Sequence, residues 1–197
     1  MSGHRIRVSL QGAMGAALFA LATSAAACGL EDPGSISMRR GMLNMAYPES
    51  LHVGTAVWQA QLAGRLPRDP VLQFGELSAD ARSNLRLARA KLLLGRFAAR
   101  LGTDAGASAP PSVAVVLLGP VLWSRLELDG ARIVPALHVD GPEGGDVVLV
   151  TDLAAIEAVA AGSLGVREAL DLGVMRLYGP PADVAAARDW LATRTRG

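Results

Sequence analysis

The sequence predicts an α+β domain in which helices pack on one face of a mostly antiparallel sheet of about five strands. Three observations support this fold class. Apolar residues recur with a helical period between residues 49 and 101, with a period of two between residues 113 and 151, and with a helical period again after residue 152. The dipeptide Asp129-Gly130 separates two of the alternating stretches and is a strong hairpin signal. The expected order of elements is α-α-β-β-β-β-α-α-β-α.

Two helices are expected before the strands. The first covers residues 49–66, and the proline-containing stretch 67–70 ends it. The second covers residues 78–101, with Ser78 as N-cap and one broad apolar stripe. The stripe consists of Leu85, Leu87, Ala88, Leu92, Leu94, Ala98, Ala99 and Leu101.

Four strands follow a linker over residues 102–112, and they are expected at 113–118, 121–128, 131–139 and 146–151. On the second strand one face is predicted to point into the core, and it carries Leu122, Ser124, Leu126 and Leu128. Pro135 in the third strand indicates an edge position or a bulge, because proline cannot donate to the hydrogen-bond ladder.

The C-terminal part adds a helix capped by Asp152 and ended by Gly162, and a short helix over 166–172. A strand over 174–178 follows, and Pro180-Pro181 starts a final helix that ends near residue 193. We therefore expect residues 49–197 to form one domain. Residues 28–48 show no period and are predicted to be a tether or extended segment.

Residues 1–27 have the pattern of a secretory signal peptide. Arg5 and Arg7 give a basic start, residues 8–27 carry no charge, and the small residues 25–27 precede Cys28. The apolar part is about 15 residues long, whereas a membrane-spanning helix needs about 20. We therefore expect the chain to be exported and residues 1–27 to be removed.

Cys28 is the sole cysteine. The stretch Ala-Ala-Ala-Cys-Gly resembles a loose bacterial lipobox, in which the thiol receives a diacylglycerol and the cysteine becomes the first residue. Ala25 stands where the best lipoboxes carry leucine. A lone cysteine in an exported protein has no intramolecular disulfide partner. We favour a lipoprotein anchored to the membrane through Cys28, and the alternative is a soluble periplasmic protein cut after Ala27.

Composition excludes several classes of function. Without Arg5 and Arg7 the 19 basic residues fall to 17, against 18 acidic residues, so the bulk charge does not indicate nucleic-acid binding. His52 and His138 are not at metal-ligand spacing, and no second cysteine supports a thiolate site. Phosphate-binding glycine loops and nucleophile elbows are also absent from the sequence. We expect no catalytic residues, no cofactor and no metal.

Five arginines of the helix expected at 78–101 share one side. Their steps of 4, 3, 7 and 4 residues place them within about 40° of one line. They are Arg82, Arg86, Arg89, Arg96 and Arg100. Such a face is either an ordinary solvated surface or a contact for anionic lipid headgroups or an acidic partner.

Residues 144–179 resemble the sterol-carrier-protein-2 superfamily. The resembling features are, in order, a strand led by Asp146, a helix from Asp152, Gly162 followed by Leu164, Glu168-Ala169, Gly173, the strand Val174–Leu177 and Gly179. About 36 residues match closely and about 85 match by element order, and residues 78–193 form the similar part. The resemblance implies an apolar tunnel between sheet and helices that takes acyl chains or sterols, without catalytic residues. The familiar members are intracellular, whereas this chain has the pattern of an exported one.

The sequence therefore predicts a periplasmic, membrane-anchored module that binds an apolar ligand such as a lipid, a sterol-like molecule or a quinone. The expected lining is Leu122, Leu126, Ile133, Leu137, Val148, Val150, Ile156, Leu164, Met175 and Leu177. The alternative is an accessory subunit of an envelope assembly with a solid core. In that case residues 29–66, rich in methionine and apolar side chains, would dock the partner.

The mass of the mature N-terminus tests the expected processing. In the native host we expect a diacylglyceryl adduct on Cys28, and we expect Cys28→Ser to lose both the adduct and fractionation with the membrane, because two acyl chains anchor stably where one does not. An unmodified N-terminus at Cys28 would mean a soluble periplasmic protein. An N-terminus at Met1 or Ser2 would contradict export.

Overall fold

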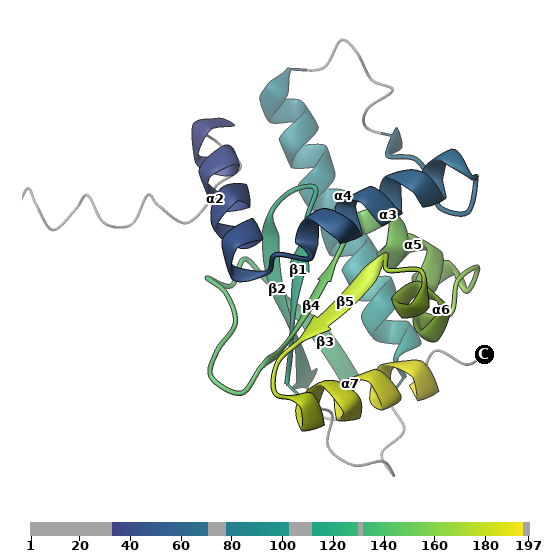
Figure 1. Ribbon diagram of the computed structural model, residues 1–197. Helices are drawn as coiled ribbons and strands as arrows, with labels where there is room; N and C mark the ends of the chain where they lie inside the picture. Colours follow the sequence, from purple (N-terminus) through teal and green to yellow (C-terminus); the bar gives the residue numbers. More distant parts are fainter. Residues whose placement is uncertain (1–32, 71–77, 103–111, 130–131, 195–197) are drawn as a thin grey trace, which may run out of the picture.

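The computed structural model describes residues 33–70, 78–102, 112–129 and 132–194 (Figure 1). In chain order the elements are α2 (Pro33–Ala46), α3 (Ser50–Leu62), α4 (Ala79–Arg100), β1 (Val113–Leu117), β2 (Leu122–Asp129), β3 (Arg132–Leu137), β4 (Val147–Thr151), α5 (Leu153–Ala161), α6 (Val166–Asp171), β5 (Met175–Tyr178) and α7 (Pro181–Arg194). This order confirms the α+β class and adds one helix, α2, at the start. The predicted signal peptide, Cys28 and most of the expected linker lie outside the described residues.

The five strands form one sheet in the order β3-β2-β1-β4-β5. The pairs β1/β2, β2/β3 and β4/β5 are antiparallel, and β1/β4 is parallel. Asp129 and Arg132 face each other across the expected hairpin, whose turn residues 130–131 lie outside the described part. β3 is an edge strand, as the proline at position 135 indicates.

The centre of the sheet is covered on both faces. All five residues of β1 and all five of β4 are buried, and successive side chains of a strand point to opposite faces. This corrects the expectation that helices cover one face only. Burial on both faces explains why these two strands read as unbroken apolar runs. In Figure 1, α4 passes behind the sheet, α2 and α3 lie at its upper end, and α7 lies at its lower end.

α4 is the main helix behind the sheet, and it contacts α5 and β3. The hydroxyl of Ser78 accepts a hydrogen bond from the Ala81 N–H and caps the helix as expected. Leu94 and Phe97 are fully buried in the core. Leu85 and Leu92 are 44% and 54% exposed, so the apolar stripe is narrower than its sequence pattern predicts.

α2 corrects the prediction that residues 28–48 form a tether or extended segment. Its residue Leu43 is buried in the core cluster. Tyr47, directly after the helix, contacts Trp123 of β2 and Tyr178 of β5, with ring centroids 6.1 and 5.0 Å apart. Among residues 40–46, whose side chains the structure describes, only Leu43 is buried, and a single buried side chain gives no repeating apolar pattern.

The loop from β3 to β4 must cross the sheet, because the two strands are separated by β2 and β1. Arg125 of β2 holds this crossover loop, residues 138–146. Its guanidinium donates to Glu143 at 2.8 Å, to Asp146 at 3.2 Å and to the Gly141 carbonyl at 3.4 Å. The Asp146 carboxylate also accepts hydrogen bonds from the Ser112 hydroxyl and from the Glu143 N–H. The side chains of Arg125 and Asp146 are only 13% and 2% exposed.

The ionisation of Asp146 therefore contributes to stability. Burial opposes the charged form, but the hydrogen bonds from Ser112 and Glu143 and the charge of Arg125 outweigh burial and lower the pKa of Asp146 below its ordinary 3.8. A carboxyl group with a lowered pKa stabilises the fold above its unfolded pKa and loses this contribution as the pH falls through the folded value.

We expect the free energy of unfolding to decrease as the pH falls below 3.8. Asp146→Asn should lower this free energy by about 1–3 kcal/mol at neutral pH and weaken its acid dependence. Asp171→Asn, at an exposed position, is the control and should change neither. Chemical denaturation across the acid range checks this. Equal acid dependence in Asp146→Asn and in the unchanged chain would contradict it.

Candidate functional site

The ten residues predicted to line a tunnel lie in the core or pack against it. The strand register divides them between the two faces of the sheet. Leu122, Leu126, Ile133, Leu137, Met175 and Leu177 share one face, whereas Val148 and Val150 occupy the other face. Ile156 lies in α5, and Leu164 follows that helix. Their role in ligand binding remains a prediction, and none of them lines the pockets described below.

A pocket of about 490 Å³ lies between α2, β2 and the crossover loop, and we call it the α2 pocket. This volume lies in the range of small-molecule sites. Eight of its nine lining residues are apolar or aromatic, and Asp140 is the charged one. The lining is Met42, Leu43, Ala46, Tyr47, Val121, Trp123, Val139, Asp140 and Pro142.

Two strained residues flank the α2 pocket. Val121 has φ +50° and His138 has φ +61°, and among the described residues they are the only non-glycine residues with positive φ. Val121 lines the pocket, and His138 directly precedes the lining residue Val139. A positive φ is unfavourable for a β-branched residue, and such strain concentrates at functional sites. The His138 N–H donates to the Trp123 carbonyl of β2 at 3.1 Å, which places His138 beside the strand that starts directly after Val121.

The aromatic residues give the α2 pocket a firm wall. Tyr47 and Trp123 both line it, and they contact each other. Burial raises the pKa of Tyr47, so its hydroxyl stays protonated and can donate a hydrogen bond. The sequence analysis missed the α2 residues of this pocket because it treated their segment as a tether. The signal that was available is the concentration of methionine and apolar residues between positions 29 and 66.

A second, more open groove of about 600 Å³ lies between α2, α3 and the turn after β1. Leu51 and Trp58 of α3 line it, and they are 60% and 59% exposed. Arg40 of α2 spans the groove and donates to the Gly119 carbonyl at 3.1 Å. Thus α2 lies between the α2 pocket, whose lining is mainly apolar, and this groove, whose lining is both polar and apolar.

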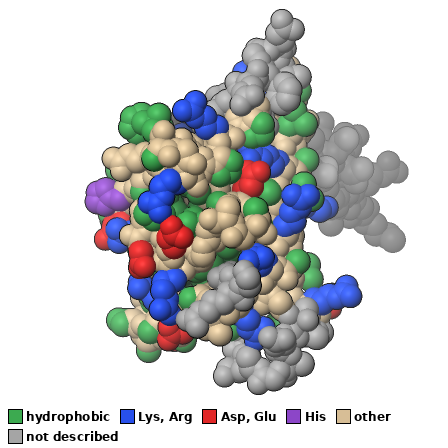
Figure 2. Space-filling model, turned by 90° about the vertical axis from the view of Figure 1, so that its right-hand side faces the viewer, with side chains coloured by type: hydrophobic (Ala, Val, Ile, Leu, Met, Phe, Trp, Pro, Cys, Tyr) green, Lys and Arg blue, Asp and Glu red, His purple; other side chains and the backbone are tan. Residues whose placement is uncertain are grey.

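The five arginines of α4 do not form one solvated face, which corrects the expected stripe. Arg89 is only 15% exposed and binds both Glu157 of α5 and, at 2.8 Å, Asp69. Arg86 also pairs with Asp69, and Arg100 lies against Gly162 at the end of α5. Arg96 is exposed, and Arg82 is half-buried. In Figure 2 basic and acidic side chains are interspersed rather than separated into one basic strip.

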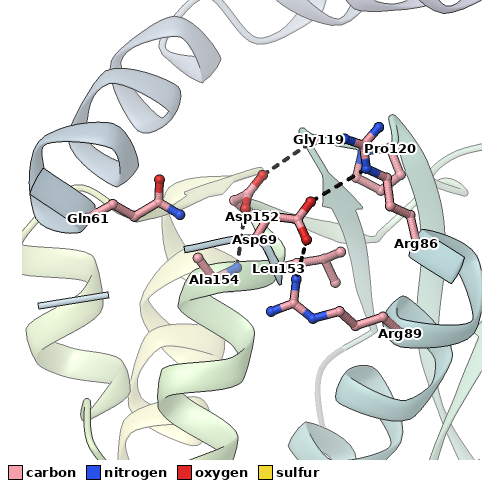
Figure 3. Close-up of a pocket in the computed structure, with 9 residues that line it drawn as sticks. All are labelled: Gln61, Asp69, Arg86, Arg89, Gly119, Pro120, Asp152, Leu153 and Ala154. Carbon is pink, nitrogen blue, oxygen red and sulfur yellow. Dashed lines mark hydrogen bonds and ion pairs between the residues drawn. The ribbon is translucent and has the colours of Figure 1, made fainter. Parts of the chain in front are cut away.

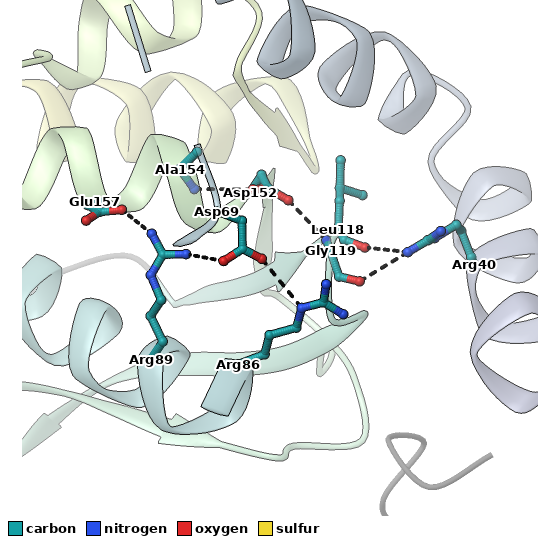
Figure 4. Close-up of polar contacts among 9 residues, drawn as sticks. All are labelled: Arg40, Asp69, Arg86, Arg89, Leu118, Gly119, Asp152, Ala154 and Glu157. Carbon is teal, nitrogen blue, oxygen red and sulfur yellow. Dashed lines mark hydrogen bonds and ion pairs between the residues drawn. The ribbon is translucent and has the colours of Figure 1, made fainter. Parts of the chain in front are cut away.

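The arginine–carboxylate contacts belong to a small polar network (Figures 3 and 4). Asp152 caps α5 through the Ala154 N–H and also accepts from the Gly119 N–H at 3.1 Å. Beside it, Arg86 and Arg89 converge on Asp69. The enclosed space is about 50 Å³, which suits a water molecule rather than an organic substrate. The contacts tie α4, α5 and the segment after α3 together.

Other candidate groups stay apart. Asp146 and Asp152 precede and follow β4, so they do not form a carboxylate pair. No group of three or more histidine, cysteine, aspartate or glutamate side chains suited to a metal ion occurs within the described ranges. Of the helices that the structure describes, none is long and apolar enough to cross a membrane.

No protein-family model and no curated protein matches the chain. Among solved structures, palmitated sterol carrier protein 2 like 2 from Aedes aegypti aligns with a TM-score of 0.40 and 20% identity, over 54% of this chain and 94% of that one. A candidate sterol carrier protein from Thermus thermophilus gives 0.33 and 22%, over 55% and 85%. The inverting sec-alkylsulfatase of a Pseudomonas species gives 0.38 and 20%, over 48% of this chain and 15% of that one. Sterol-carrier-like proteins are thus among the structural neighbours of this chain.

The structural role of Arg89 can be tested by substitution. Arg89→Met should lower the free energy of unfolding by about 1–3 kcal/mol, because Glu157 and Asp69 then lose a charged partner in a partly buried place. Arg96→Met removes an exposed arginine from the same helix, and this variant should change the free energy of unfolding by no more than about 0.5 kcal/mol. Denaturant titration of both variants checks this. If Arg89→Met and Arg96→Met changed the free energy of unfolding equally, the five arginines would instead form one solvated face.

Proposed function

We propose that this protein is a non-catalytic binding module, exported and anchored to the membrane through Cys28, that holds an apolar small molecule in the α2 pocket. The observation that carries the proposal is the pocket itself, with eight apolar or aromatic residues among the nine that line it. The two strained turns beside it support the same assignment. The lining residues predicted from sequence pack in the core. The proposal therefore places the ligand outside this core, in the α2 pocket that Trp123 lines.

The polar groups of the pocket narrow the ligand class. Asp140 is the charged residue of the lining, and its carboxylate would repel the headgroup of a fatty-acid anion. A hydroxyl group, in contrast, can donate to Asp140, and a carbonyl can accept from the Tyr47 hydroxyl. We therefore favour a neutral ligand with a hydroxyl or carbonyl group, such as a sterol-like molecule, a neutral lipid or a quinone.

Filling the α2 pocket tests this function. Ala46 is exposed and lines the pocket, so Ala46→Trp should obstruct it without disturbing the core, and ligand affinity should fall roughly tenfold or more. Ala88→Trp introduces the same side chain at an exposed site of α4 and is the matched control. Native mass spectrometry of protein purified from its host, with organic extraction of the ligand, measures the occupancy.

Two results would count against the proposal. The protein purified from its host could be free of ligand and fail to take up neutral lipids or quinones. Alternatively, Ala46→Trp and Ala88→Trp could retain the same occupancy, which would place any ligand outside the α2 pocket.

A further inference from the structure

Helix α3 is apolar on two opposite sides. Val53, Val57 and Ala60 are buried against the domain. Leu51, Trp58 and Leu62 are 60%, 59% and 56% exposed, and we call these three side chains the α3 stripe. Steps of seven and four residues place them within about 40° of one line, on the side away from the buried residues. A surface helix normally carries one apolar stripe, which faces the core, so the second, exposed stripe of α3 is unusual.

Two acidic residues near α3 are held in ion pairs, and Asp152, which lines the groove beside Leu51 and Trp58, accepts hydrogen bonds from the Gly119 and Ala154 N–H groups. Glu49, just before α3, is paired with Arg176 at 2.5 Å, and Glu168 is paired with Arg65 at 2.7 Å. On the neighbouring helix α2, Met42 and Met45 are 62% and 84% exposed. Trp58 and the aliphatic side chains have the composition of an interfacial surface, in which tryptophan lies at headgroup level and aliphatic groups enter the acyl boundary.

The position of Cys28 in the chain indicates which surface is near the membrane. Only residues 29–32 separate Cys28 from the start of α2 at Pro33. A chain of this length reaches at most roughly 18 Å even when fully extended. An anchor at Cys28 therefore keeps the start of α2 within this reach of the bilayer, and three residues separate the other end of α2 from the start of α3. This step rests on the anchoring that forms part of the proposed function.

We propose that the α3 stripe docks on the surface of the lipid bilayer, with Leu51, Trp58 and Leu62 inserted at the headgroup–acyl boundary. The domain then lies against the membrane instead of hanging from a tether. Met42 lines the α2 pocket on one side of α2, whereas Arg40 and Asn44 on the opposite side line the groove beside the α3 stripe, so the pocket and the docking stripe are separate surfaces of the domain.

Fluorescence quenching of the full chain in vesicles tests the contact. The vesicles consist of phosphatidylethanolamine and phosphatidylglycerol, with bromine placed either near the headgroup end or near the methyl end of the acyl chains. The difference in emission between the chain and Trp58→Phe isolates Trp58 from Trp123 and Trp190. We expect a blue shift of the Trp58 emission and stronger quenching by the shallow bromine than by the deep bromine.

Matched variants show whether the whole α3 stripe takes part. Leu51→Ser with Leu62→Ser should lose most of the Trp58 quenching. Leu92→Ser with Leu128→Ser removes two leucines that are equally exposed, at 54% and 53%, on α4 and β2, and it should retain the quenching. All four positions are exposed, so far-UV circular dichroism is expected to stay unchanged in both variants.

The outcomes separate this inference from the proposed function. Quenched Trp58 without a diacylglyceryl adduct on Cys28 would support docking and remove the anchor. An adduct on Cys28 with Trp58 unquenched, or failure of the chain to float with vesicles, would overturn docking. Unquenched Trp58 that crosslinks instead to an envelope protein would also overturn it and assign the α3 stripe to a protein partner.

Discussion

The contact between Arg125 and Asp146 is the constraint on which much of the arrangement depends. The sheet places β4 beside β1, on the far side of two strands from β3, so the chain must return across the sheet after β3. The crossover loop, which has no regular secondary structure, connects β3 to β4. Arg125 binds this loop through the Asp146 carboxylate and the Gly141 carbonyl. Because each charge has little access to water, each depends on the other for compensation. The parallel pairing of β1 with β4, and therefore the position of β5, follows from this connection.

The same connection shapes the α2 pocket. The crossover loop supplies Val139, Asp140 and Pro142 as one wall, and Trp123 of β2 stands two residues from Arg125. The opposite wall is α2, which is held by burial of Leu43 and by the aromatic contacts of Tyr47. The pocket therefore lies between a loop fixed by an ion pair and a helix fixed by a few apolar contacts. Its ligand would bind beside the sheet face that carries Trp123, rather than between the sheet and α4.

Local patterns predicted most of the secondary structure. The five strands, the hairpin at Asp129, the edge position of Pro135 and the Asp152 cap are set by neighbouring residues, and the structure confirms them. The sequence analysis missed features that depend on distant partners. α2 has a weak pattern because contacts of Leu43 and Tyr47 with other elements stabilise it. The arginine spacing was correct as helix geometry, but only the fold shows that Asp69 and Glu157 reach Arg89. The pocket also depends on distant partners. Alternation along a strand predicts which face a residue occupies, but it does not predict where the packed elements leave a cavity.

The location of the ligand tests the central claim most directly. A crystal structure of the protein purified from its native envelope, without exchange into detergent that would remove the ligand, is the measurement. The account predicts electron density for an apolar molecule between Tyr47, Trp123 and Val139. Density between the sheet and α4, among Leu126, Ile133 and Leu137, would contradict the assigned site and restore the lining predicted from sequence.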